Sequence, residues 1–193
     1  KNKAVQDVRA PVPKSPTRKK IKLSCWMSSL DKIYPGSGKL ENWVNKQNRE
    51  HFVLSDKLDG FSIEVDYDAK GNIQLSSGGD GVYGQDLNHL IEHFDLPKAK
   101  NLTIRCEGAM LASKHSKFAN LFKTPRTALS NVFNNSNPNM DAVKATRIVA
   151  LEIIKPAGLP SDAQFKKLKA LGFEVPRNKK VPVDDLTEEY LRS

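Results

Sequence analysis

The chain has 193 residues, 38% of them hydrophobic and 27% charged, which is the composition of a folded protein and a length that suits one domain. No apolar run reaches the ~18–20 residues that span a bilayer, and the first residues lack a secretory signal pattern, so we expect no membrane partner. The 31 Lys and Arg outnumber the 22 Asp and Glu, and the resulting net charge of +9 favours polyanions such as nucleic acid. A merely basic soluble protein is the alternative.

Two cysteines, Cys25 and Cys106, lie far apart and match no metal-ligand spacing, so no metal-binding residues are assigned. Free thiols in a reducing, cytoplasmic-type compartment are the simplest interpretation.

Residues 1–22 resemble a basic arm in composition. Pro11, Pro13 and Pro16 interrupt this segment, and five Lys and Arg residues crowd its end. A segment with so little apolar surface to bury either contacts nucleic acid or drapes over the surface as a leader. We predict a single folded domain over residues 23–193.

Hydrophobic periodicity predicts the first elements of this domain. Apolar residues at helical spacing indicate a short helix over Lys39–Asn48. Strict alternation over Phe61–Tyr67 is the period of a half-buried strand, and the turn residues at 68–72 precede further alternation. A β-hairpin is therefore predicted here.

The remainder of the chain mixes both periods. Helical spacing recurs over 87–94 and 113–122, and alternation indicates a strand over Leu102–Glu107. The β-branched run Arg147–Ile154 is typical of a central strand. Ser161 with Gln164 predicts a capping box for a helix that Gly172 ends. Strands in hairpins intermixed with helices place the fold in the α+β class.

The segment from Ser55 to Gly60 carries the first candidate for chemistry. If it is extended, Lys57 and Asp59 project to the same face. A lysine acts as a nucleophile only after losing its proton, which requires desolvation or nearby cations. An exposed turn with a solvated lysine is the simpler interpretation of this motif alone.

Arg105 and Glu107 lie two residues apart on a predicted strand and therefore share a face. The two charges could pair with each other. Alternatively, the carboxylate accepts the hydroxyls of a ribose and the guanidinium grips phosphate. The glycine-rich run 78–84 is either a flexible linker or a place where backbone approaches a ligand closely.

Taken together, the motifs resemble the adenylation domain of bacterial-type NAD-dependent DNA ligases. The resemblance runs from about Trp26 to Val175, and its parts occur in the family's order: Met27-Ser28-Ser29-Leu30-Asp31, Lys57-Leu58-Asp59-Gly60, Gly79-Asp80-Gly81 with Gly84-Gln85-Asp86, Arg105-Cys106-Glu107, Thr124-Pro125-Arg126 and Leu171-Gly172-Phe173-Glu174-Val175. It implies an α+β nucleotidyltransferase fold, of the ATP-grasp-like type of DNA ligase adenylation domains.

The resemblance also implies a mechanism. Lys57 would attack the α-phosphorus of NAD and carry AMP, which then passes to the 5′-phosphate of nicked double-stranded DNA before the 3′-hydroxyl displaces it. Mg²⁺ would assist by offsetting charge on the phosphate oxygens. Asp59 would support the chemistry, Glu107 would hold the ribose, and Arg126 would contact phosphate or the nicotinamide nucleotide.

Several positions depart from the family pattern. Ser55 stands where the family has the acidic residue that reads adenine, with Asp56 beside it, and both remain nucleotide-binding candidates together with Arg105. Gly78 and Asn134 stand where arginines are usual, and Cys106 replaces a glycine.

The chain stops before the family's last lysine motifs, so we expect it to be a shortened fragment or the N-terminal subunit of a split viral or phage-type ligase. A second subunit would then supply the remainder. An ATP-dependent ligase or transferase, and a non-catalytic DNA-binding subunit, are the alternatives.

Overall fold

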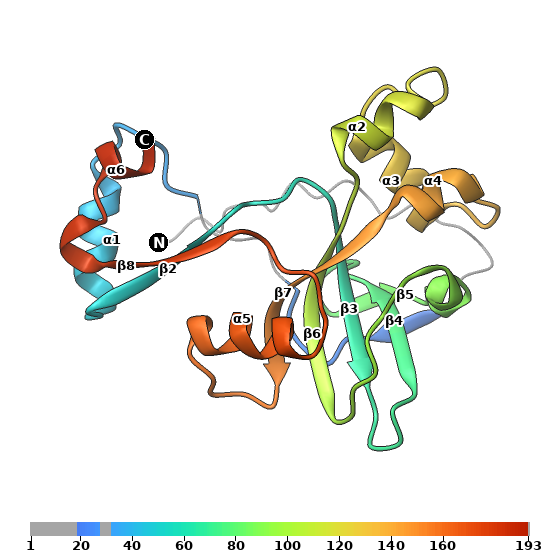
Figure 1. Ribbon diagram of the computed structural model, residues 1–193, viewed down its shortest axis with the longest axis horizontal. Coiled ribbons are helices and arrows are strands. Elements are labelled where there is room, and N and C mark those ends of the chain that lie inside the picture. The colour runs from blue at the N-terminus through green and yellow to red at the C-terminus, as the bar shows by residue number, and fades with distance from the viewer. Residues whose placement is uncertain (1–18, 28–31, 193) are drawn as a thin grey trace, which may run out of the picture.

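Four antiparallel strands form the largest sheet in the computed structural model, which describes residues 19–27 and 32–192 (Figure 1). Their order across the sheet is β4 (Ile73–Ser77), β3 (Phe61–Tyr67), β6 (Leu102–Ala109) and β7 (Arg147–Lys155). In the turn between β3 and β4, the Asp68 carboxylate accepts hydrogen bonds from the backbone N–H groups of Lys70 and Asn72. The predicted hairpin is confirmed, because Asp68 satisfies the backbone where the strands reverse.

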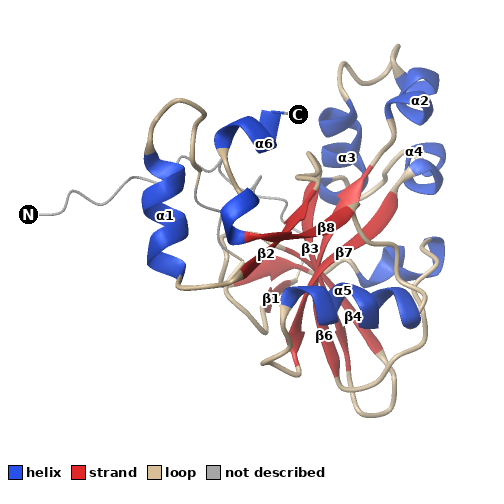
Figure 2. Cartoon of the chain, turned by 60° about the vertical axis from the view of Figure 1, so that its left-hand side comes forward, coloured by secondary structure: helices blue, strands red, loops and turns tan. Residues whose placement is uncertain are grey.

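One face of this sheet carries the main hydrophobic core. Ile63, Val65 and Tyr67 on β3 are at most 2% exposed, and Ile104 and Cys106 on β6 are fully buried beside them. Helical segments cover this face, as Figure 2 shows: η1 (Asn88–His93), α3 (Pro125–Asn134), α4 (Met140–Ala145) and α5 (Ser161–Ala170). Antiparallel sheets packed with helices agree with the predicted α+β class.

The opposite face of the sheet is polar, and residues 23–27 lie across it. Glu64 is only 3% exposed, and its carboxylate accepts hydrogen bonds from the backbone N–H groups of Ser24 at 2.9 Å and Cys25 at 3.2 Å. Alternation alone predicts a strand with one solvated side, and this is wrong for Glu64 because the segment 23–27 removes it from water. The predicted arm 1–22 lies mostly outside the described residues. Its last part forms β1 (Lys20–Lys22), which pairs with β5 (Tyr83–Gln85).

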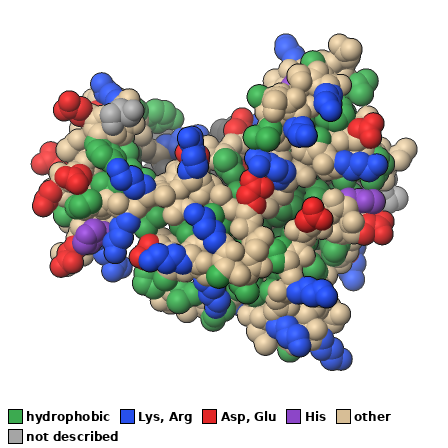
Figure 3. Space-filling view, in the orientation of Figure 1, with side chains coloured by type: hydrophobic (Ala, Val, Ile, Leu, Met, Phe, Trp, Pro, Cys, Tyr) green, Lys and Arg blue, Asp and Glu red, His purple; other side chains and the backbone are tan. Residues whose placement is uncertain are grey.

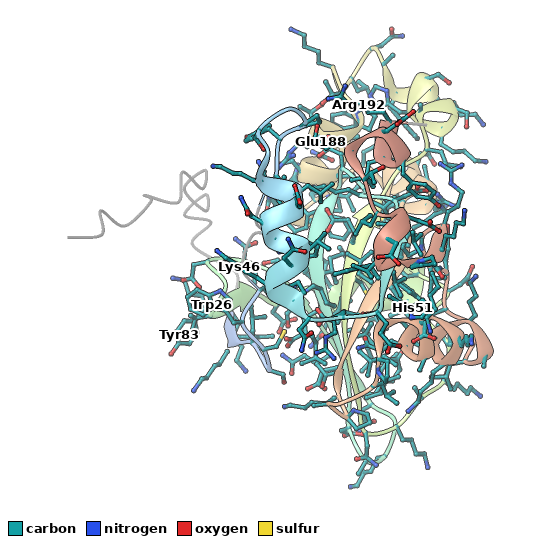
Figure 4. The ribbon with its side chains drawn as sticks, turned by 90° about the vertical axis from the view of Figure 1, so that its left-hand side faces the viewer. Trp26, Lys46, His51, Tyr83, Glu188 and Arg192 are labelled. Carbon is teal, nitrogen blue, oxygen red and sulfur yellow. The ribbon has the colours of Figure 1, made fainter. Side chains whose placement is uncertain are left out.

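A smaller lobe stands beside the main sheet (Figure 1). Its two-stranded ribbon and helices are β2 (His51–Ser55), β8 (Asn178–Pro182), α1 (Lys39–Gln47), η3 (Val183–Asp185) and α6 (Glu188–Arg192). Leu40, Val44 and Leu186 form its buried core. The Gly36 N–H donates to Glu188 at 2.6 Å, which ties the loop before α1 to α6, and Figure 4 shows Glu188 and Arg192 beside α1.

Two predicted features of β7 and α5 are wrong. The strand β7 lies at an edge of the four-stranded sheet rather than in its centre, and only an isolated parallel bridge from Val149 to Glu174 covers it. The predicted capping box of α5 is absent, because the Gln164 side chain instead accepts from the Ile153 N–H and donates to the Leu159 carbonyl. Gln164 therefore joins α5 to β7.

The other predicted helices differ in length and type. The prediction over Lys39–Asn48 is confirmed by α1. The segment 87–94 forms the 3-10 helix η1, and the segment 113–122 holds two short pieces, α2 (Ala112–His115) and η2 (Ser116–Phe118). No helix among the described residues has the length and apolar character that crossing a bilayer requires.

Both cysteines are free thiols, as predicted. Burial is the main cause that raises the pKa of Cys25 to about 11, and it also raises the pKa of the fully buried Cys106. Both groups therefore stay protonated near neutral pH, which makes them poor nucleophiles.

Candidate active site

Lys57 lies where the chain passes between the small lobe and the main sheet. Residues 56–60 make this passage from β2 to β3, and residues 173–177 make the return passage toward β8. The two passages are joined, since the Asp56 N–H donates to the Arg177 carbonyl at 3.1 Å. Lys57 therefore lies at the junction of two separately packed parts of the protein. Figure 1 shows the chain passing between the β2–β8 ribbon and the main sheet.

A backbone hydrogen bond brings two of the predicted motifs together. The Gly60 N–H donates to the Glu107 carboxylate at 3.1 Å. A side chain at position 60 would not fit, because a Cβ there would lie 2.2 Å from the Gly108 carbonyl oxygen. Glycine is thus required for β3 to begin against the end of β6, and this contact fixes Lys57 near Glu107.

Asp59 and Arg126 form an ion pair on the surface of the same region. Their side-chain atoms lie 2.7 Å apart, and both side chains are more than 70% exposed. Arg126 is held in the first turn of α3, which Thr124 caps in a reciprocal capping box with Thr127. Exposed pairs of this kind contribute about 0–1 kcal/mol, so a phosphate can replace Asp59 as the partner of Arg126.

The Lys57 side chain is exposed in this structure. The desolvation that a lysine nucleophile requires is therefore not supplied by burial of Lys57 among the described residues. A ligand lying over Lys57 would have to exclude the water.

Glu107 is the electrostatically perturbed group of the site. Burial raises the pKa of the Glu107 carboxyl, while the Gly60 N–H and the charges of Lys57 and Arg126 act in the opposite direction. The charges of Lys57 and Arg126 therefore act on the Glu107 carboxyl, so these residues lie in one electrostatic neighbourhood. A carboxylate with only part of its hydrogen-bonding capacity satisfied is suited to accept a hydroxyl.

Replacing Glu107 with glutamine is expected to leave the protein as stable or slightly more stable at neutral pH, by a few degrees in Tm at most. The folded state holds the Glu107 proton more tightly than the unfolded chain does, so the wild type loses stability as the pH rises above the usual glutamate pKa of about 4.3 and through the folded-state value. Glutamine does not titrate and still accepts from Gly60. Thermal unfolding across pH 4 to 8 checks this, and a Tm gap that stays constant over this range would contradict it.

Arg105 is engaged differently from the predicted alternatives. Its guanidinium donates to the Trp26 carbonyl at 2.7 Å and lies 3.5 Å from Glu152, not in a pair with Glu107. The Nε atom is buried without a hydrogen-bond partner among the described residues. Arg105 thus holds the segment 23–27 against the polar face. Trp26 itself is 63% exposed and lies on the same outer side as Tyr83 (Figure 4).

Ser55 and Asp56 lie on the β2–β8 side of the site. The Asp56 carboxylate accepts from the Arg177 Nε at 2.7 Å, and Ser55 lies opposite Asn178 in the ribbon. No hydrogen bond or ion pair within residues 19–27 and 32–192 joins either of them to Glu107, so their role toward adenine stays a prediction. Sequence reasoning missed Arg177 and Asn178, because their approach to Ser55 and Asp56 depends on pairing across more than 120 residues.

The remaining predicted motifs are placed as follows. Ser28–Asp31 lies outside the described residues. Gly78 begins the glycine-rich loop, where its N–H donates to the Ser62 carbonyl at 2.7 Å. A Cβ at position 78 would lie 3.0 Å from the Ser62 Cβ, so this loop leaves little room for a longer side chain. Asn134 ends α3, and its amide donates to the Ser130 hydroxyl at 3.1 Å.

Comparison with known proteins shows the family of the chain. A sequence model of the NAD-dependent DNA ligase adenylation domain matches residues 17–190. A DNA ligase of Acanthamoeba polyphaga mimivirus is 30% identical over 165 residues, which cover 81% of this chain and 26% of that protein. A putative DNA ligase, 205R, of Invertebrate iridescent virus 6 is 33% identical over 65% of this chain and 21% of that protein. A DNA ligase of Mycoplasmopsis pulmonis is 25% identical over 90% of this chain and 29% of that protein.

The chain therefore belongs to the NAD-dependent DNA ligase adenylation domain family. It spans between 21% and 29% of the length of these three relatives.

Proposed function

We propose that this chain is the nucleotidyltransferase part of an NAD-dependent DNA ligase and that Lys57 carries AMP. The observation that supports this most directly is the hydrogen bond from the Gly60 N–H to Glu107, because it joins the lysine motif to the acidic motif of the family. Each motif is unspecific by itself. An AMP site requires the lysine and the acidic residue to lie side by side, and the hydrogen bond between Gly60 and Glu107 supports this arrangement.

In the proposed reaction, the neutral Lys57 amine attacks the α-phosphorus of NAD. A nitrogen–phosphorus bond forms, the bond to the nicotinamide mononucleotide breaks, and the amine proton is released. AMP then passes from Lys57 to the 5′-phosphate at a nick, and the adjacent 3′-hydroxyl displaces it to form the phosphodiester. The nucleotide itself covers the exposed amine and removes it from water.

Glu107 accepts hydrogen bonds from the ribose hydroxyls, for which its partly buried carboxylate beside Gly60 is placed. Arg126 leaves its weak pair with Asp59 when phosphate arrives. Asp59 is then free to orient the Lys57 amine. Ser55 and Asp56 complete the nucleotide-binding set, whereas Arg105 stays engaged with Trp26 and Glu152.

Mg²⁺ fits the residues present. This ion is usually held by one or two carboxylates together with substrate phosphates, and Asp59, exposed beside Arg126, is the carboxylate that could take part while Glu107 holds the ribose. No group of three or more His, Cys, Asp or Glu among the described residues could hold a metal ion, so the substrate phosphates would supply the other ligands. When bound, Mg²⁺ offsets negative charge on the phosphate oxygens.

The proposal includes nicked double-stranded DNA as the substrate, a cytoplasmic place of action in a bacterium or virus-infected cell, and a second subunit or segment that supplies the family's remaining motifs. The +9 net charge supports a polyanionic partner.

The decisive experiment compares two AMP donors. The chain, supplied in trans with a polypeptide that carries the family's remaining motifs, is incubated with Mg²⁺ and either NAD or ATP, each labelled in the AMP moiety. Its intact mass and tryptic peptides are then measured. We expect one AMP from NAD on the peptide that contains Lys57. An adduct from ATP alone would indicate an ATP-dependent transferase, and no adduct from either donor would leave the non-catalytic DNA-binding reading in its place.

A further inference from the structure

Four of the eight residues that line a groove outside the Lys57 site are cations. The groove has a volume of about 550 Å³ and lies between α2 and η2 on one side and α4 and the start of β7 on the other. Its charge is set by Lys114, Lys117, Lys144, Arg147 and Asp141, and Leu111 lines it beside α2. In Figure 3, Lys and Arg side chains gather over the part of the molecule that holds these helices.

The charges of this groove are unbalanced. Four cations face a single carboxylate, Asp141. Arg147 is paired with Glu174 at 2.5 Å, whereas Lys114, Lys117 and Lys144 are exposed and form no ion pair with any carboxylate among the described residues. Like charges around one hollow repel one another, and an anionic partner relieves that repulsion.

One end of the groove, at Arg147, lies close to the proposed AMP site along the main sheet. Arg147 lies opposite Ala109 in the pairing of β6 with β7, two residues beyond the pair of Glu107 with Val149. At about 3.3 Å per residue, this places the groove roughly 7 Å along the strand from Glu107. A strand of DNA whose end lies at Lys57 would therefore have its adjoining backbone within reach of the groove.

We propose that this groove binds the sugar–phosphate backbone of duplex DNA next to the nick, with Lys114, Lys117 and Lys144 as the phosphate contacts. The inference rests on the proposed function, since it names the DNA surface that would serve the same site. Lysine contacts of this kind carry no sequence information and release counterions, so binding depends strongly on salt and little on sequence. The three lysines of the groove are exposed, which suits an extended backbone rather than an enclosed small ligand.

The test compares two triple variants of the full chain. In the groove variant, Lys114, Lys117 and Lys144 are replaced by alanine. In the matched control, alanine replaces Lys70, Lys98 and Lys100, which are exposed near the β3–β4 turn at the other end of the sheet. Both lose three charges, and circular dichroism with thermal unfolding confirms that both remain folded.

Binding to a labelled nicked duplex is measured by fluorescence anisotropy between about 50 and 300 mM salt, where affinity that depends on phosphate contacts falls steeply. The groove variant is expected to reduce the slope of log K against log salt by about 2–3 and to weaken binding about a hundredfold near 0.1 M salt. The control is expected to change the slope by less than about 1. Equal losses in both variants would overturn the proposal, because net charge alone would then explain binding.

Two further measurements separate this proposal from others. AMP transfer from NAD to the chain is measured without DNA, and the groove variant is expected to match the wild type. If the wild type itself forms no adduct, the proposed function fails while the salt slopes still decide the groove. If the groove variant loses binding to polyglutamate but keeps its binding to DNA, the partner is an acidic protein and the DNA proposal is wrong.

Discussion

Replacing Lys57 with alanine is expected to abolish the covalent AMP adduct completely, with no residual slow labelling. The reaction needs a nitrogen lone pair at this position, and alanine removes the only atom that can bond to phosphorus there. Because Lys57 is exposed, its removal leaves no cavity in the core, and we expect the thermal stability to change little. Intact mass after incubation with NAD and Mg²⁺ measures the adduct.

Two companion variants sharpen this result. Lys57→Arg keeps the positive charge, yet its guanidinium does not lose a proton in proteins, so it is expected to bind nucleotide without forming the adduct. Lys46→Ala removes a lysine from the last turn of α1 in the small lobe and should label as the wild type does. Labelling of the Lys57→Ala protein at wild-type level would show that another residue carries AMP.

The strands of the main sheet were predictable because local pattern and tertiary environment agree there. The alternation of Phe61–Tyr67 has one purely apolar face, and the turn chemistry at Asp68 fixes where the chain reverses. The α1 helix was predictable for the same reason, since its apolar residues cover a separate small core.

The failures have a common physical cause, which is long-range pairing that local periodicity does not contain. Glu64 belongs to a polar face by pattern, but the backbone of Ser24 and Cys25 arrives from 40 residues earlier and buries it. Glu64 lies opposite Arg105 on the neighbouring strand β6. Two opposite charges at paired positions could have indicated that other groups cover this face. The β-branched run of β7 resembles a central strand because α5 buries one of its faces, although β7 has only one partner strand within the sheet.

The composition of the candidate site was predictable only through the order of its motifs. The distances along the sequence between Lys57, Glu107 and Arg126 do not indicate that these residues are close in the folded protein. The structure brings them together through Gly60, and it also shows what sequence could not, namely that Arg126 is paired with Asp59 and that Arg177 is paired with Asp56. The Asp56–Arg177 pair depends on how the two passages between the lobes run side by side, and the Asp59–Arg126 pair depends on where α3 lies relative to the first passage.

Gly60→Ala is expected to reduce the rate of AMP transfer to Lys57 by about a hundredfold or more, although it removes no polar side chain from the site. The added Cβ would lie 2.2 Å from the Gly108 carbonyl oxygen and 2.8 Å from the Glu107 Cγ, so the backbone must move. That movement breaks the hydrogen bond from Gly60 to Glu107 and displaces Lys57 from the ribose position. We also expect a loss of about 1–3 kcal/mol in the free energy of unfolding.

A control with lower stability but an undisturbed site separates the two effects. Gly71 has a φ of +90° in the β3–β4 turn, where alanine is strained, and this turn lies at the end of the sheet away from Lys57. Gly71→Ala should therefore lose stability and still label normally per folded molecule, as urea unfolding and single-turnover labelling on the same samples would measure. If Gly60→Ala labels as fast as Gly71→Ala at equal folded concentration, the contact between Gly60 and Glu107 does not position the lysine, and Glu107 must reach the nucleotide by another arrangement.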